Sequence, residues 1–382
     1  MNDLPKIFDD FSESRKKGFI TIKNLKDEGR KVVGTFCTYT PWEIITASGA
    51  VAVSLCAKSD ETIPDAEKHL PRNLCPLIKS SYGFAITDKC PYFYFSDLIV
   101  GETTCDGKKK MYEYLGEIKN IHVMQLPQTS KGEDSYRLWK NEIFKLKVML
   151  EKEVNVEITE EKIKEAIKIR NKERLALKEF YELGKMCPPP ITGLEMLRVL
   201  NGASFKWDKE VEISELNELV KEAKAKYEDG ERKVSPKAKR ILITGCPMGD
   251  ATEKIVNAIE ENGGVVVCYE NCTGVKEISK LVNEDIDPFD ALADKYLNIG
   301  CSCMTPNDNR ISLLSELVED YKVDGVIDVI LQACHTYSVE SYNIKRFINE
   351  NKNIPYMSIE TDYSQTDVGQ IKTRIAAFIE ML

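Results

Sequence analysis

Short apolar segments alternate with helical stretches in both halves of the chain, and this pattern constrains the fold more than any other feature. Seven segments rich in Val, Ile and Leu read as strands: 31–37, 50–55, 98–101, 239–245, 265–267, 325–331 and 356–359. Most are followed by turn residues and then by residues with helical periodicity. Strands and helices that alternate in this way predict parallel sheets covered by helices. The sequence therefore predicts an α/β protein.

The length of the chain and the composition of its central residues suggest how these strands are divided between domains. At 382 residues the chain is about twice the usual size of one domain. Residues 135 to about 225 are rich in Lys, Glu and Leu at helical spacing, with a break at 187–190. We predict N-terminal helices and a first α/β domain over 1–134, a helical insert or bridge over 135–235, and a second α/β domain over 236–382.

Charge and hydropathy exclude several kinds of partner. The net charge is -9, whereas nucleic-acid-binding proteins usually carry a positively charged surface. Residues 1–14 carry four acidic side chains and no apolar run, which argues against a secretory signal, and no segment is apolar enough for a membrane span. We therefore expect a cytoplasmic protein with no nucleic-acid or membrane partner.

Twelve cysteines are unexpected in a cytoplasmic chain of this size, where disulfides are rare. Five of them lie at the end of a predicted strand or just after it: Cys37, Cys105, Cys246, Cys272 and Cys334. Ligands of open parallel sheets bind beyond the carboxyl ends of the strands, so we expect a shared site in the crevice between the domains. Three histidines and the absence of a C-x2-C pair disfavour zinc. Thiolates gathered from distant loops suit an iron-sulfur cluster.

Three cysteine-bearing segments resemble, in the same order, the ligand segments of the 2-hydroxyacyl-CoA dehydratase (component D) superfamily. They are RNLCPLIKS at 72–80, GETTCDGKKK at 101–110 and LQACH at 331–335. The resemblance implies two Rossmann-like domains and a [4Fe-4S] cubane held by Cys75, Cys105 and Cys334. It also implies that the fourth iron stays open to substrate.

Within this superfamily the chain is most similar to the double-cubane cluster proteins, which join two cubanes through a bridging sulfide. Segments 34–43, 269–274 and 300–307 supply further cysteines for a second cubane. We predict Cys37, Cys272 and Cys303 as its ligands, with Cys301 as the alternative to Cys303. The preferred cofactor is therefore an [8Fe-9S] double cubane, and a single [4Fe-4S] cluster is the alternative.

Other residues near these segments have both a chemical and a structural interpretation. His335, Glu43 and Glu270 are candidates for acid-base work, but an imidazole bonded to a carbonyl and carboxylates at helix starts explain them equally well. Lys108, Lys109 and Lys110 are expected to form a solvated face or a docking patch. The remaining cysteines are expected to serve packing: Cys56, Cys90, Cys187 and Cys268.

The resemblance implies an oxidoreductase that depends on ATP through a partner. In the superfamily, electrons arrive from a separate ATP-hydrolysing iron-sulfur reductase, and this chain has no G-x4-GK[ST] nucleotide loop of its own. We predict an anaerobic homodimer that reduces small molecules such as acetylene, azide or hydrazine. The alternatives are a subunit of a 2-hydroxyacyl-CoA dehydratase with one [4Fe-4S] cluster, a non-enzymatic electron carrier and a thiol redox protein.

Overall fold

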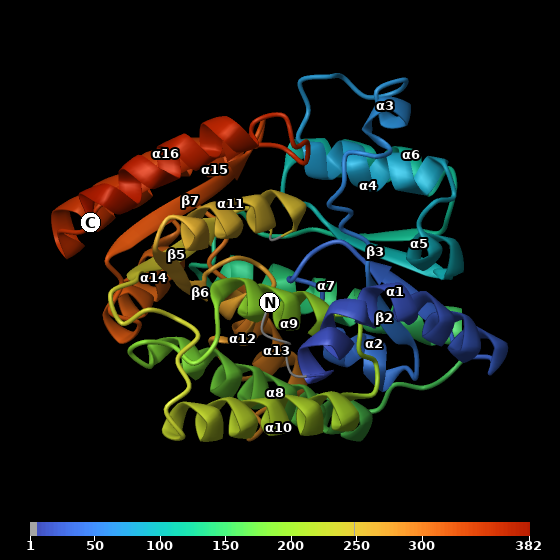
Figure 1. The fold of residues 1–382 in the computed structure, drawn as a ribbon. Helices are drawn as coiled ribbons and strands as arrows, with labels where there is room; N and C mark the ends of the chain where they lie inside the picture. The colour runs from blue at the N-terminus through green and yellow to red at the C-terminus, as the bar shows by residue number, and fades with distance from the viewer. Residues whose placement is uncertain (1–5, 248) are drawn as a thin grey trace. The chain divides into compact units, whose positions relative to one another are not determined.

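The computed structural model describes residues 6–247 and 249–382, which contain two four-stranded sheets, both entirely parallel. These residues form two compact units. We call Lys16–Arg174 with Lys280–Asn309 the first unit. The second unit is Leu175–Ser279 with Arg310–Leu382 and the described part of Met1–Arg15. The predicted α/β class is confirmed (Figure 1).

The sheet of the first unit has the strand order β2-β1-β3-β4. Its strands are β1 (Val32–Thr35), β2 (Val51–Ser54), β3 (Leu98–Glu102) and β4 (Ile121–Met124). The sequence did not predict β4, an edge strand that pairs only with β3. Only Met124 of its four residues is buried, so the strand lacks the apolar run that marks its neighbours.

The sheet of the second unit has the order β6-β5-β7-β8. Its strands are β5 (Lys239–Gly245), β6 (Gly264–Tyr269), β7 (Gly325–Leu331) and β8 (Tyr356–Thr361). The predicted bounds of β5 and β7 agree with the structure. Nearly every residue of these two strands is buried, because helices cover both faces of a parallel sheet, and such strands read as near-continuous apolar runs.

Helices surround both sheets. In the first unit they are α2 (Trp42–Ala47), α3 (Ile63–Ala66), α4 (Pro76–Ile86), α5 (Pro91–Phe95), α6 (Asp106–Gly116), α7 (Glu133–Val154) and α13 (Pro288–Leu297). In the second unit they are α9 (Gly193–Ala203), α10 (Lys209–Glu228), α11 (Asp250–Glu261), α12 (Val275–Ile278), α14 (Asp308–Asp320), α15 (His335–Phe347) and α16 (Val368–Met381). The chain passes between the units within α1 (Lys6–Asp27), within α8 (Glu160–Glu182), after α12 and within the first turn of α14. The N-terminal region thus contains one described helix rather than several.

The helices of 135–235 contribute to two separate hydrophobic cores. Ile143, Leu146 and Leu150 of α7 belong to the core of the first unit. Leu197 of α9 and Leu216 of α10 belong to the core of the second unit. No helix among the described residues is both long enough and apolar enough to span a bilayer.

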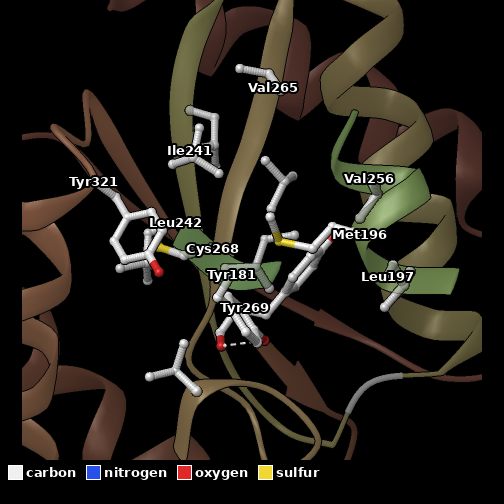
Figure 2. Packing of buried hydrophobic residues seen from close by; sticks show 14 of the residues in the cluster. Tyr181, Met196, Leu197, Ile241, Leu242, Val256, Val265, Cys268, Tyr269 and Tyr321 are labelled. Carbon is white, nitrogen blue, oxygen red and sulfur yellow. Dashed lines mark hydrogen bonds between the residues drawn. The ribbon is translucent and has the colours of Figure 1, made fainter. Parts of the chain in front are cut away.

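Cys268 lies in the middle of the second core (Figure 2). It is fully buried on β6, among residues such as Leu242, Tyr269 and Tyr321. Burial raises the pKa of its thiol well above the usual value, so the group stays neutral. The prediction that Cys268 serves packing is therefore confirmed, whereas the same prediction for Cys187 is wrong because that side chain is exposed.

Candidate metal centre

The three cysteines predicted to hold the first cubane occupy the same position in three helices. Cys75 is the N-cap residue of α4, Cys105 of α6 and Cys334 of α15. The first N-H groups of a helix and its dipole favour negative charge at this end, so they stabilise a thiolate. The local structure thus favours the form of cysteine that binds metal at all three positions.

Cys75 and Cys105 belong to the first unit, where the starts of α4 and α6 pack together. A Cβ atom placed on Gly107 would lie 2.7 Å from Ile78 Cδ1 and 3.1 Å from Leu74 Cδ1. The first turn of α6 therefore rests on the residues that flank Cys75. Cys334 belongs to the second unit, and its sulfur lies 3.8 Å from the hydroxyl oxygen of Thr336.

A second group of cysteines gathers around Tyr39 in the first unit. The sulfur of Cys303 lies 4.0 Å from Tyr39 Oη, and the Tyr39 hydroxyl donates a 2.8 Å hydrogen bond to Ile299 O. Burial raises the pKa of Tyr39, and so do Cys303, Cys301 and Cys37, the three thiols that surround it. A hydrogen bond with Cys301 is the main cause of a raised pKa at Cys303.

The structure thus brings Cys37, Cys301 and Cys303 together. The sequence could not choose between Cys301 and Cys303, and the structure places both beside Cys37. Cys272 lies instead in the loop after β6, in the second unit. Cys246, expected to take part in the shared site, is buried after β5, and its sulfur accepts a 3.2 Å hydrogen bond from Leu331 N.

The donor atoms of these two groups are cysteine sulfurs, which suit an iron-sulfur cluster. Within residues 6–247 and 249–382, no three His, Cys, Asp or Glu side chains are arranged to hold one metal ion. A cubane spans more space than one ion, so its protein sulfurs lie farther apart. Cysteine thiolates are the typical ligands of iron-sulfur clusters.

The proposed acid-base residues differ in their surroundings. Glu43 is fully buried, with Arg174 Nη1 2.9 Å from one oxygen and the Tyr296 hydroxyl donating at 2.7 Å to the other. Both oxygens are occupied, which favours an anchoring role for Glu43. His335 is an exposed residue at the start of α15, so solvent and small molecules can reach its ring.

Glu270 anchors the loop that carries Cys272. The carboxylate is fully buried, 2.9 Å from Lys276 Nζ and 3.5 Å from Arg310 Nε, and it accepts a 2.6 Å hydrogen bond from Thr244. Burial alone would raise its pKa, but Lys276 and Arg310 outweigh burial and lower the pKa. Glu270 therefore stays ionised and forms a structural ion pair with Lys276 and Arg310.

The sequence missed a buried polar cluster next to Cys37, which consists of Thr40, Glu102, Lys108 and Tyr112. Thr40 donates a hydrogen bond to one oxygen of Glu102, and the other oxygen has no hydrogen-bond partner among the described residues. Burial raises the pKa of Glu102 to about 7, although Lys108 and Thr40 oppose this shift. Lys108 donates a 2.9 Å hydrogen bond to the carbonyl of Phe36.

The predicted solvated face of Lys108 to Lys110 is wrong for its first member. Lys108 is only 7% exposed, whereas the side chains of Lys109 and Lys110 are 43% and 69% exposed and pair with Asp106 and Glu113. A signal was present in the sequence. Lys108 is three, four and seven residues before the buried Met111, Tyr112 and Leu115, so it lies on the apolar face of α6.

Arg174→Met is expected to lower the free energy of unfolding by about 3–5 kcal/mol, because it leaves Glu43 as a buried charge without its cation. Urea unfolding measures the loss, and the double variant Arg174→Met/Glu43→Gln should recover much of it. Arg198→Met is the matched control, since Arg198 and Glu253 are both partly exposed and 4.0 Å apart. Its loss should stay below about 1 kcal/mol, and equal losses in both single variants would contradict the assigned role of Glu43.

Comparison with known proteins identifies related sequences along the whole chain. A family model described as "2-hydroxyglutaryl-CoA dehydratase, D-component" matches residues 37–382. A "putative dehydratase subunit YjiM" of Escherichia coli (strain K12) is 59% identical over 382 residues, covering 100% of this chain and 99% of that protein. The (R)-phenyllactyl-CoA dehydratase beta subunit of Clostridium sporogenes is 26% identical over 392 residues, with 100% of both chains covered. One of the benzoyl-CoA reductase subunits of Thauera aromatica is 20% identical, covering 93% of this chain and 92% of that protein.

Proposed function

Because the chain belongs to the 2-hydroxyglutaryl-CoA dehydratase D-component family, we propose that it is an iron-sulfur reductase component that carries a double cubane. Its relatives are dehydratase or reductase subunits, and this similarity supports an enzymatic role. The family that the cysteine-bearing segments indicated is confirmed. The double cubane and the reduction of small molecules are our proposal.

One observation carries the proposal, namely that the chain contains more grouped cysteines than one cubane needs. Cys37, Cys301 and Cys303 share one neighbourhood in the first unit. None of them is among Cys75, Cys105 and Cys334, the proposed ligands of the first cubane. The second group would hold the second cubane, with Cys272 as the proposed alternative to Cys301. When bound, such a centre supplies single electrons of low potential.

The surrounding residues have distinct tasks in this proposal. The N-termini of α4, α6 and α15 would stabilise the thiolates of Cys75, Cys105 and Cys334. Buried Tyr39 would help to exclude water from the second group. His335, exposed next to Cys334, is the proposed proton donor to substrate.

The electron source is proposed to be a separate ATP-hydrolysing iron-sulfur reductase. The chain lacks a G-x4-GK[ST] loop, so the nucleotide would be used by the partner. A homodimer is the proposed assembly. The relatives named as dehydratase or reductase subunits support the need for partner proteins in general.

The second candidate is a subunit of a 2-hydroxyacyl-CoA dehydratase with one [4Fe-4S] cluster. Its support is the full-length similarity to the (R)-phenyllactyl-CoA dehydratase beta subunit. Such a protein would eliminate water from a CoA thioester, together with a second, homologous chain.

Anaerobic protein mixed with its cognate ATP-dependent reductase is expected to reduce acetylene, and turnover should fall to background when either ATP or the reductase is omitted. Low-potential electrons are hard to obtain from ordinary donors, which explains this strict dependence. Gas chromatography of ethylene measures the reaction. Equal turnover with a reductant of modest potential and no partner would contradict the mechanism. Loss of water from a 2-hydroxyacyl-CoA, seen only with a homologous second chain, would favour the dehydratase.

A further inference from the structure

Lys108 is a buried lysine that forms no ion pair with a carboxylate in the described part of the chain. Its side chain is almost completely enclosed, and it donates a hydrogen bond to the carbonyl oxygen of Phe36 at 2.9 Å. Among the described residues, no carboxylate oxygen lies within ion-pair distance of its Nζ atom. A buried ammonium group is costly unless a negative charge compensates it, so this arrangement needs an explanation.

Three other buried lysines of the same protein do have such partners. Lys79 Nζ lies 2.8 Å from Glu67, Lys254 Nζ lies 2.6 Å from Asp367, and Lys276 Nζ lies 2.9 Å from Glu270. Burial of a lysine is therefore accompanied by a carboxylate at these three positions. Lys108 differs from them in the kind of group that it faces.

The groups that face Lys108 are two thiols, a phenol and one carboxyl group. Phe36 O also accepts a 2.9 Å hydrogen bond from the sulfur of Cys56. Cys37, Cys56, Tyr112 and Glu102 are the groups close enough to affect Lys108 electrostatically. Glu102 already shares one oxygen with Thr40, and the Tyr112 hydroxyl has no hydrogen-bond partner in the described chain.

Lys108 lies near a candidate ligand of each group, Cys105 of the first and Cys37 of the second. It lies in the first turn of α6, the helix that Cys105 caps, and it binds the carbonyl that directly precedes Cys37. A cluster held by thiolates is anionic and becomes more negative on reduction. Such a cluster would add negative charge beside Lys108, where the described residues place one carboxyl group, that of Glu102, whose pKa burial raises to about 7.

We propose that Lys108 is the counter-charge of the iron-sulfur centre that Cys37 helps to hold, and that it favours the reduced form of this centre. The inference rests on the proposed function, because it requires that the chain bind a cluster. Lys108 acts here as a positioning residue through charge and does not touch substrate.

The test compares Lys108→Gln and Lys108→Met with Lys109→Met. Glutamine keeps a donor for Phe36 O but removes the charge, methionine removes both, and Lys109 is the exposed neighbour. We expect the equilibrium constant for one-electron reduction to fall about tenfold in both Lys108 variants, which lowers the midpoint potential by ~59 mV. Redox titration followed by electron paramagnetic resonance measures this shift, and Lys109→Met should show none.

Unfolding of the apoproteins provides a second readout. Without a cluster, Lys108→Gln should unfold with a free energy close to that of wild type, because glutamine keeps a donor for Phe36 O. Loss of iron from both Lys108 variants, with stable apoproteins, would also support the proposal. An unchanged midpoint potential in Lys108→Gln would overturn it and leave only a structural hydrogen bond. A wild-type protein that binds no iron would overturn the proposed function itself.

Discussion

Replacing Cys334 with alanine is expected to remove at least half of the iron that the wild-type protein binds, because it disrupts the first cubane. The substitution takes one of three proposed protein thiolates from a cubane and leaves one iron without its anchor. The same loss is expected for Cys75→Ala and Cys105→Ala, because each residue occupies the N-cap of its helix in the same way. Iron per chain after anaerobic reconstitution measures the effect.

The matched control for these variants is Cys187→Ala. Cys187 is exposed, and its sulfur contacts the carbonyl oxygen of Lys185 at 3.6 Å. This variant should keep its full iron content. Circular dichroism separates loss of iron from loss of fold. Unchanged iron in Cys334→Ala would contradict the ligand set taken from the dehydratase family.

Replacing Cys37 with alanine is expected to remove about half of the iron, since it disrupts the second cubane and leaves the first in place. Cys303→Ala should behave in the same way. Comparing Cys301→Ala with Cys272→Ala then identifies the remaining ligand. The proximity of Cys37, Cys301 and Cys303 favours Cys301. Iron analysis together with electron paramagnetic resonance of the retained centre measures the outcome.

Cys90→Ala serves as the control for the second group. The Cys90 sulfur accepts a 3.4 Å hydrogen bond from Phe93 N at the start of α5, which is a structural role. Its loss should cost some stability but no iron. Full iron retention in Cys37→Ala and Cys303→Ala would argue for a single cubane.

The sequence predicted most of the fold because buried parallel strands have a strong local signature. β5 and β7 were found with their observed bounds, since apolar residues dominate both strands and nearly all of their side chains are buried. β4 was missed because it is a short edge strand with one buried residue. The family followed from three cysteine-bearing segments that match in order.

The contacts within the candidate site were less predictable. Lys108 stands in a run of three lysines, and only the packing of α6 determines which of them is buried. The proximity of Cys37 to Cys301 and Cys303 depends on contacts between residues far apart in the chain, as the hydrogen bond from Tyr39 to Ile299 illustrates. Spacing along the chain carries no information about such contacts.

The number of iron and acid-labile sulfide ions in the anaerobically reconstituted wild-type protein tests the central claim most directly. A double cubane predicts roughly eight irons and nine sulfides per chain, whereas one [4Fe-4S] cluster contains about four of each. We expect the larger number, with the second group of cysteines accounting for the difference. About four irons per chain would contradict the double cubane and favour the dehydratase subunit, and zinc in place of iron would contradict an iron-sulfur centre altogether.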